Sequence, residues 1–161
     1  MSVLRLENRL RTFLDENDVR YLRIDHSPAY TAQEIAALTH ISGKELAKTV
    51  MVKVDGELAM AVLPASDYVD FDALSVAAGS ADVDLAEEDE FQARFPDCEL
   101  GAMPPFGNLY EMKVFLSPAL AEDEEITFNA GSHTELIKMK YSDYERMVGA
   151  SIVRLPDSVR T

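Results

Sequence analysis

Three short segments of the sequence carry residue types that could do chemistry on a bound ligand. The first is residues 43–50, in which Lys48 stands directly before a run of nearly continuous apolar residues. An ammonium group fixed at the start of a strand is well placed to meet negative charge that develops on a substrate. A lysine at such a position is also often an ordinary solvated side chain. The pattern alone leaves both interpretations open.

The second segment is the loop 101–107, which reads GAMPPFG. Its terminal glycines permit unusual backbone angles, and its two prolines stiffen the middle. A rigid loop of this kind can direct backbone N–H and C=O groups at a ligand. The alternative is a stiff connector whose Phe106 is buried in the core.

The third segment is the tight turn 130–133, which reads AGSH and lies between two predicted strands. It presents the Ser132 hydroxyl and the His133 imidazole where the rim of a barrel would be. An imidazole there suggests a general base, but orientation of the substrate is equally consistent. A hairpin turn with polar tips remains the alternative.

Motifs for most nucleotide- and metal-dependent reactions are absent from the sequence. It contains no GxxxxGK[ST], no GxGxxG, no HExxH and no GxSxG. The three histidines lack metal-ligand spacing and have no cysteine cluster to join. Cys98 lies between two acidic residues, which raise the pKa of a thiol, so a cysteine nucleophile is not expected. We therefore expect neither a metal nor another cofactor.

The length and composition predict one domain that spans residues 1–161. The chain has 161 residues, of which 47% are hydrophobic, enough for a full core without disulfide or metal staples. A single cysteine cannot form an internal disulfide, and the N-terminus has no signal-peptide or membrane-span pattern. These features predict a cytoplasmic protein that does not associate with membranes.

The net charge of −14 limits the partners that the protein could have. Long nucleic-acid footprints need a basic face, because neutralisation of phosphates supplies most of the affinity. DNA is therefore not an expected partner. A contact with nucleic acid should be small and local, such as one terminus.

Helices and strands alternate irregularly along the chain. The capping-box patterns Thr31-x-x-Glu34 and Ser142-x-x-Glu145 each predict a helix start, and the pair Asp55-Gly56 predicts a tight hairpin. The predicted helices are 2–18 (capped by Ser2), 31–40, 67–77 (capped by Ser66 or Asp67), 87–94 and 142–148, with a helical turn at 44–47. The predicted strands are 19–24, 49–54, 57–63, 111–116, 126–129, 135–139 and 151–155. The fold class is α+β: a curved, mixed, barrel-like sheet of about six or seven strands with surrounding helices.

The three segments, in this order, resemble the YbaK/ProX family of aminoacyl-tRNA editing domains, which also occur inserted in prolyl-tRNA synthetases. The resemblance rests on the Lys-Thr-Val strand start at 48–50, the GxxxPFG loop at 101–107 and the AGxH turn at 130–133. The helix start TAQE at 31–34 and the LPA segment at 63–65 also fit. Together these segments extend the resemblance over nearly the whole chain.

The resemblance implies a fold like that of the prolyl-tRNA-synthetase-associated domain and hydrolysis of mischarged tRNA that carries a small amino acid. By resemblance, the catalytic residues are Lys48, Gly101 and His133. The implied substrate-binding residues are Thr31, Thr49, Pro105, Phe106, Gly131 and Ser132. Ser117 departs from the family, which often has Asp there, and some cysteine-editing members differ at the His133 position. The second departure leaves the edited amino acid open.

In this interpretation water attacks the ester, and negative charge develops on the carbonyl oxygen. Lys48 could stabilise that oxygen or contact the terminal phosphate. The expected partner is the 3′ end of aminoacyl-tRNA, with an aminoacyl-tRNA synthetase as an open second partner, and the expected state is a monomer. Two alternatives remain: a non-catalytic module that binds the tRNA 3′ end or a synthetase, and a hydrolase of free amino-acid esters.

Overall fold

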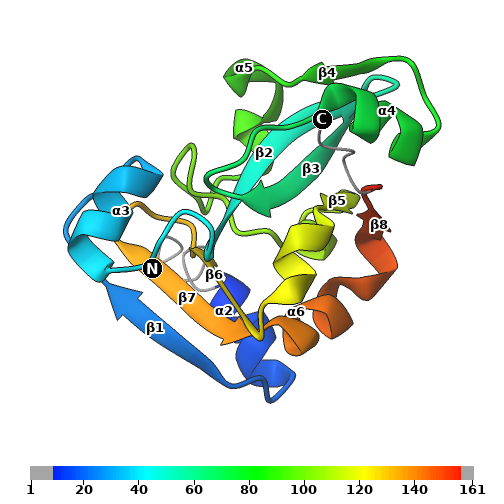
Figure 1. Cartoon of the computed structure of the whole chain (residues 1–161). Coiled ribbons are helices and arrows are strands. Elements are labelled where there is room, and N and C mark those ends of the chain that lie inside the picture. Colours follow the sequence, from blue (N-terminus) through cyan, green and yellow to red (C-terminus); the bar gives the residue numbers. More distant parts are fainter. Residues whose placement is uncertain (1–8, 157–161) are drawn as a thin grey trace.

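The computed structural model describes residues 9–156, which form one mixed eight-stranded sheet with helices around it (Figure 1). The strand order is β1-β7-β6-β2-β3-β5-β8, and β4 pairs with β2 outside this path. The strands are β1 (Tyr21–Asp25), β2 (Leu46–Val54), β3 (Glu57–Pro64), β4 (Val83–Leu85), β5 (Val114–Leu116), β6 (Glu125–Asn129), β7 (Glu135–Lys140) and β8 (Ile152–Arg154). The α-helices are α2 (Arg9–Glu16), α3 (Ala32–Thr39), α4 (Phe71–Ala78), α5 (Glu88–Phe91) and α6 (Tyr141–Val148).

The sheet confirms the predicted mixed architecture. Strand β2 is antiparallel to β3 but parallel to β6, and β5 is parallel to both β3 and β8. The described part of the chain holds one strand more than the predicted six or seven, because the three-residue β4 pairs with the far end of β2. The three residues of β4 are too few to show the alternation of apolar and polar side chains by which a strand is recognised from sequence.

The hairpin β2–β3 follows its predicted local chemistry. Asp55 and Gly56 both adopt positive φ angles, 54° and 81°, as a type I′ turn requires. The turn fixes the register, which places Lys48 opposite Leu63. Both strands read as nearly continuous apolar runs because each face of the sheet is covered at this point.

Hydrophobic clusters cover both faces of the sheet. The main core includes Ala47 and Met51 of β2 on one face, together with Leu10 of α2 and Tyr144 of α6. Leu46 of β2 faces the opposite side, where it packs with Ile35 of α3 and Leu136 of β7. Neighbouring residues of β2 therefore point to different clusters, and Lys48 shares the face of Leu46.

Several element boundaries differ from the sequence prediction. Residues 43–45 form a turn and β2 already begins at Leu46, so the helical turn predicted at 44–47 is wrong. Helix α4 starts at Phe71 with Asp70 as its N-cap, later than the predicted cap at Ser66 or Asp67. Helix α6 follows β7 without a loop, so Lys140 occupies the N-cap and Ser142 does not cap it.

The remaining predicted ends agree with the structure to within two residues, as far as it describes them, with two exceptions: β5 begins at Val114 and not at 111, and α5 ends at Phe91, followed by a 3₁₀ turn to Arg94. Thr31 caps α3, and its hydroxyl accepts a 3.1 Å hydrogen bond from the Glu34 N–H. The predicted first helix is seen from Arg9 onward, and its predicted Ser2 cap lies outside the described residues. None of the described helices is long and apolar enough to cross a membrane.

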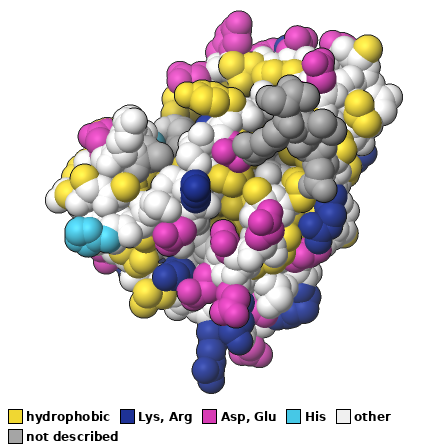
Figure 2. Space-filling model, in the orientation of Figure 1, with side chains coloured by type: hydrophobic (Ala, Val, Ile, Leu, Met, Phe, Trp, Pro, Cys, Tyr) yellow, Lys and Arg dark blue, Asp and Glu magenta, His cyan; other side chains and the backbone are white. Residues whose placement is uncertain are grey.

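Charged side chains are mixed over the visible surface (Figure 2). On this face Asp and Glu side chains are scattered among Lys and Arg, and the described residues do not gather into a broad basic patch. Lys53 is paired with Glu90 at 2.5 Å. That any contact with nucleic acid is small stays a prediction.

Candidate active site

The loop 101–107 and the turn 130–133 meet, although 29 residues separate Ala102 from Gly131 in the chain. The Gly131 N–H donates to the Ala102 carbonyl at 2.9 Å, and the Glu99 N–H donates to the Gly131 carbonyl at 2.7 Å. The Glu99 carboxylate also accepts a 2.6 Å hydrogen bond from the His133 N–H. One hydrogen bond thus joins the loop directly to the turn, and two more join the turn to Glu99, just before the loop.

The His133 ring is held in one orientation by the loop. Its Nε2 lies 2.7 Å from the Leu100 carbonyl oxygen, which can only accept, so Nε2 must carry the proton. In the neutral imidazole the free lone pair is therefore on Nδ1. The Tyr30 ring covers the imidazole, with ring centroids 4.6 Å apart.

Gly101 occupies a position that only glycine fits easily. Its φ is +84°, and a Cβ there would lie 3.4 Å from Cε1 of His133. Gly131 also has a positive φ, +99°, at the tight part of the turn. The Gly101 backbone can therefore approach the imidazole closely, whereas Gly131 faces the Asp97 carbonyl and the Cys98 sulfur.

A buried polar cluster supports the loop from beneath. Tyr110 donates a 2.9 Å hydrogen bond to Asp97, and the Asp97 carboxylate also pairs with Arg9 at 3.5 Å. The Cys98 sulfur lies 3.3 Å from the Tyr110 hydroxyl. Burial raises the pKa of Tyr110, so the phenol stays protonated as the donor. This cluster fixes the chain directly before Leu100 and Gly101.

We expect Cys98→Ser to retain the parental catalytic rate. Burial raises the pKa of the Cys98 thiol to about 12, so at pH 8 only about 10⁻⁴ of it is thiolate. The serine hydroxyl can keep the hydrogen bond to Tyr110. The measurement is the rate of ester hydrolysis by both proteins, with iodoacetamide labelling of the folded parent in parallel. Loss of most activity in the variant would contradict this expectation and support Cys98 as the nucleophile.

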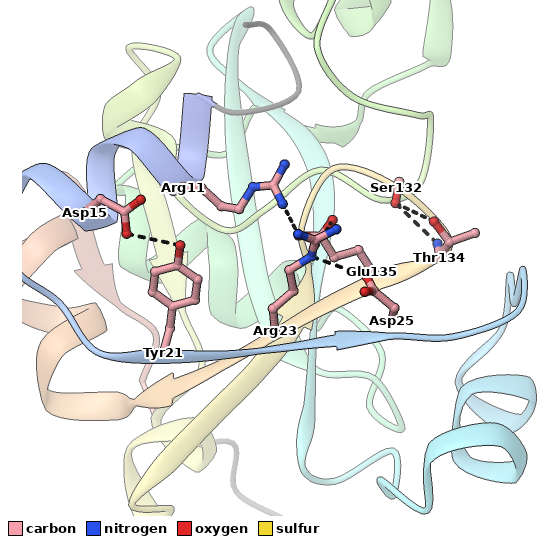
Figure 3. Close-up of polar contacts among 8 residues, drawn as sticks. All are labelled: Arg11, Asp15, Tyr21, Arg23, Asp25, Ser132, Thr134 and Glu135. Carbon is pink, nitrogen blue, oxygen red and sulfur yellow. Dashed lines mark hydrogen bonds and ion pairs between the residues drawn. The ribbon is translucent and has the colours of Figure 1, made fainter. Parts of the chain in front are cut away.

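The turn is also anchored at its base (Figure 3). Glu135, which directly follows the turn, accepts ion pairs from Arg11 at 3.6 Å and from Arg23 at 3.5 Å. Ser132 and Thr134 hydrogen-bond each other through their hydroxyls at 3.1 Å. The Ser132 hydroxyl is therefore engaged in a hydrogen bond next to the turn.

Lys48 lies in β2, beside the strand that leads into the turn. The last paired residues of β2 and β6 are Ala47 and Phe128, so Lys48 is level with Asn129, two residues before Gly131. The half-buried Lys48 ammonium lies 5.3 Å from the centroid of the Tyr68 ring. Burial lowers the pKa of Lys48, and the nearby Asp67 opposes this shift.

The structure thus joins Gly101, Gly131 and His133 by direct contacts and places Lys48 on the neighbouring strand. A cavity of about 720 Å³ is lined in part by Leu63, Asp67 and Tyr68, between β3, α4 and the segment after β5. Lys48, Gly101 and His133 do not line it. We predict that Lys48, the loop and His133 line one common pocket, and this stays a prediction.

The other predicted substrate-binding residues have varied surroundings. The Thr31 hydroxyl is engaged in the cap of α3, and the Pro105 carbonyl accepts a 2.8 Å hydrogen bond from Tyr144. The Phe106 ring is completely buried and packs edge-to-face on Phe128. Phe106 is therefore part of the core, and its ring anchors the loop.

Two residues near the site carried no recognisable signal in the sequence. Tyr30 is 67% exposed yet covers His133, and Glu99 fastens the turn to the loop. Nothing in the spacing of either residue distinguishes it from an ordinary surface side chain. Their roles follow only from the long-range contact of loop and turn.

Comparison with known proteins finds relatives that match nearly the whole chain. The chain is 26% identical over 150 residues to the multifunctional Ser/Thr-tRNA deacylase ProXp-y of Escherichia coli K12, covering 90% of this chain and 89% of the relative. It is 25% identical over 144 residues to the prolyl-tRNA editing protein ProX of Acetoanaerobium sticklandii, covering 86% and 87%.

A solved structure described as a candidate trans-editing enzyme for prolyl tRNA synthetase has the same fold. It aligns with a TM-score of 0.76 at 16% identity, over 95% of this chain and 98% of that chain. The family model of the aminoacyl-tRNA editing domain matches residues 26–147, which include every candidate residue named above from Tyr30 to His133. The chain belongs to the aminoacyl-tRNA editing domain family.

Proposed function

We propose that this protein is an aminoacyl-tRNA deacylase, which hydrolyses the ester between a wrongly attached small amino acid and the tRNA 3′ end. The observation that carries the proposal is the hydrogen-bonded unit of loop and turn, which presents Gly101 and His133 beside the strand of Lys48. Family membership supplies the reaction class. We also propose that residues 1–161 act as one editing domain in the cytoplasm, where charged tRNA is made.

Lys48 is the residue that we assign to the developing oxyanion. Lys48 is half-buried, its ammonium lies over the Tyr68 ring, and it forms no salt bridge with the described carboxylates. Moving from Tyr68 toward the turn needs only rotation of a flexible side chain. An ammonium at the carbonyl oxygen in a water-poor site lowers the barrier to attack.

The loop and His133 position the ester and the attacking water. Gly101 brings a backbone free of any side chain against the imidazole. Since Nε2 donates to Leu100, only Nδ1 is left to accept a proton or a hydroxyl hydrogen bond. An aminoacyl ester is labile, so good positioning with one fixed charge suffices for fast hydrolysis.

We expect His133→Gln to stay within about 10-fold of the parental rate and His133→Ala to fall further. The glutamine amide can reproduce the N–H that His133 Nε2 donates to Leu100, but it has no basic Nδ1. The measurement is single-turnover deacylation by the three proteins. If the glutamine variant is as slow as the alanine variant, His133 acts as a base and not mainly as a positioning residue.

The crowding around His133 favours a small amino acid. Tyr30 covers the imidazole and the Gly101 backbone lies against its edge, which restricts the space for a substrate side chain. A synthetase pocket separates amino acids that differ by one methylene only about 10–200-fold, so a second site for the smaller errors is useful. The name of the E. coli relative makes serine and threonine the first candidates.

Competition experiments separate this function from its two alternatives. The measurement is hydrolysis of mischarged tRNA and of the same amino acid as a free ethyl ester, each with and without excess uncharged tRNA. We expect uncharged tRNA to inhibit and the free ester to be a poor substrate. Efficient, uninhibited hydrolysis of the ester would favour a small-molecule esterase. Binding of tRNA without hydrolysis would favour a non-catalytic module, with the tRNA 3′ end or a synthetase as its partner.

A further inference from the structure

One edge of β2 is interrupted beside Lys48. Strand β3 occupies one edge along the whole of β2. On the other edge β6 pairs only with Leu46 and Ala47, and β4 pairs only with Val52–Val54. Thr49 lies in the interval between them, opposite no paired residue. We call this unpaired stretch of the β2 edge, with Lys48, Thr49 and Asn129 beside it, the strand notch.

Backbone polar groups point into the strand notch. The Leu46 carbonyl accepts from the Ala65 N–H on the β3 side, whereas the Met51 carbonyl accepts from the Ala86 N–H on the other side. Hydrogen-bonding directions alternate along a strand, so the Thr49 N–H and C=O share the direction of Met51. They face the notch, at a place where the sheet supplies no neighbouring strand.

Asn129 lies beside the strand notch. Asn129 lies one residue beyond the last β6–β2 pair, level with Lys48, and opposite Leu136 in β7. Leu46 and Leu136 belong to one cluster, so Asn129 and Lys48 share that face of the sheet. Both residues directly follow the last β2–β6 pair, so their side chains start from neighbouring positions on that face of the sheet.

The Asn129 side-chain oxygen is buried and has no hydrogen-bond partner among the described residues. Buried polar atoms are nearly always satisfied, because an unpaired one destabilises the fold. Lys48 is the adjacent donor, but its ammonium lies over the Tyr68 ring. Asn129 thus supplies an acceptor without a partner, which rotation of its side chain would turn toward a donor bound at the notch.

We propose that Asn129 is a substrate-binding residue, whose side-chain oxygen accepts a hydrogen bond from the α-ammonium group of the aminoacyl ester. This inference rests on the proposed function. The α-ammonium is two bonds from the carbonyl carbon. An ester whose carbonyl oxygen contacts Lys48 therefore brings its α-ammonium close to Asn129, which is level with Lys48. The Thr49 carbonyl is a second acceptor within the notch. A charged donor also gives the stronger hydrogen bond to a buried oxygen.

The test is the binding of two non-hydrolysable analogues to the parent and to Asn129→Leu. One analogue is adenosine with alanine in amide linkage at its 3′ position, and the other carries a propionyl group, which lacks the ammonium. We expect Asn129→Leu to weaken binding of the alanyl analogue about 10–100-fold and to leave the propionyl analogue within about 2-fold. The variant should also melt about 2–4 °C higher, because it removes an unpaired buried polar atom.

Asn108→Leu is the matched control. The Asn108 side-chain oxygen is also buried without a partner, but it lies in the segment Gly107–Leu109 and not at the notch. We expect it to raise the melting temperature similarly and to leave both affinities unchanged. Equal weakening of both analogues by Asn129→Leu, or no weakening of either, would overturn the inference, as would a parent with no preference for the alanyl analogue. Asn129-dependent binding in a protein that deacylates nothing would instead refute only the proposed function.

Discussion

Lys48→Ala is expected to slow deacylation about 10²–10³-fold while the melting temperature stays within about 2 °C of the parent. Lys48 is half-buried, its ammonium lies 5.3 Å from the centroid of the exposed Tyr68 ring, and it forms no salt bridge with the described residues, so its removal leaves no partner charge buried. The stability change should be about 0.5 kcal/mol or less. The oxyanion, by contrast, would lose its cation. The measurement is single-turnover hydrolysis, with thermal unfolding run on the same samples.

Lys48→Arg should also be slow, because the planar guanidinium is larger and spreads its charge. Lys113→Ala is the control for loss of one positive charge, since Lys113 is exposed and precedes β5 at a distance from the turn in the sheet order. It should hydrolyse the substrate at the parental rate. Near-parental rates in Lys48→Ala would make Lys48 a surface residue and remove the proposed source of charge stabilisation.

Gly101→Ala is expected to lower both the rate and the stability. The φ of +84° costs an alanine about 1–2 kcal/mol, which corresponds to a melting temperature about 2–8 °C lower. The new methyl group would also come into van der Waals contact with the imidazole, 3.4 Å from His133 Cε1. A misplacement of the site by about 1 Å can cost about 100-fold in rate, so we expect a loss of about 10–100-fold.

Gly56→Ala separates backbone strain from crowding of the site. Gly56 has nearly the same φ, +81°, but nothing lies within 4 Å of the position that its Cβ would take. It should lose similar stability at the hairpin turn and keep the parental rate. Equal rate losses in the two variants would mean that the Gly101 effect is only a loss of stability.

The parts of the fold that follow from adjacent residues were predictable from the sequence. The Asp55-Gly56 turn and the Thr31 cap depend on interactions within four residues, and both occur as expected. The helical turn at 44–47 failed because tertiary pairing overrode local propensity: Leu46 and Ala47 pair with β6, far away in the sequence. The Ser142 pattern failed because β7 runs straight into α6.

The assembly of the site could not be derived from spacing. The contact between Gly101 and His133 joins segments that only the folded sheet brings together, and the family resemblance was the sole guide to it. The tautomer of His133 depends on the Leu100 carbonyl, and the notch depends on where β6 leaves β2. No local pattern encodes either feature, so Tyr30, Glu99 and Asn129 became visible only in three dimensions.

The most direct test of the deacylase assignment is hydrolysis of a panel of tRNAs charged with alanine, serine, threonine or cysteine. Each is incubated with the parent, with Lys48→Ala and with buffer alone, and the remaining ester is followed over time. We predict that the parent hydrolyses at least one of the four well above the buffer rate, and that Lys48→Ala does not. If the folded parent leaves all four at the buffer rate, the deacylase assignment for these substrates is contradicted.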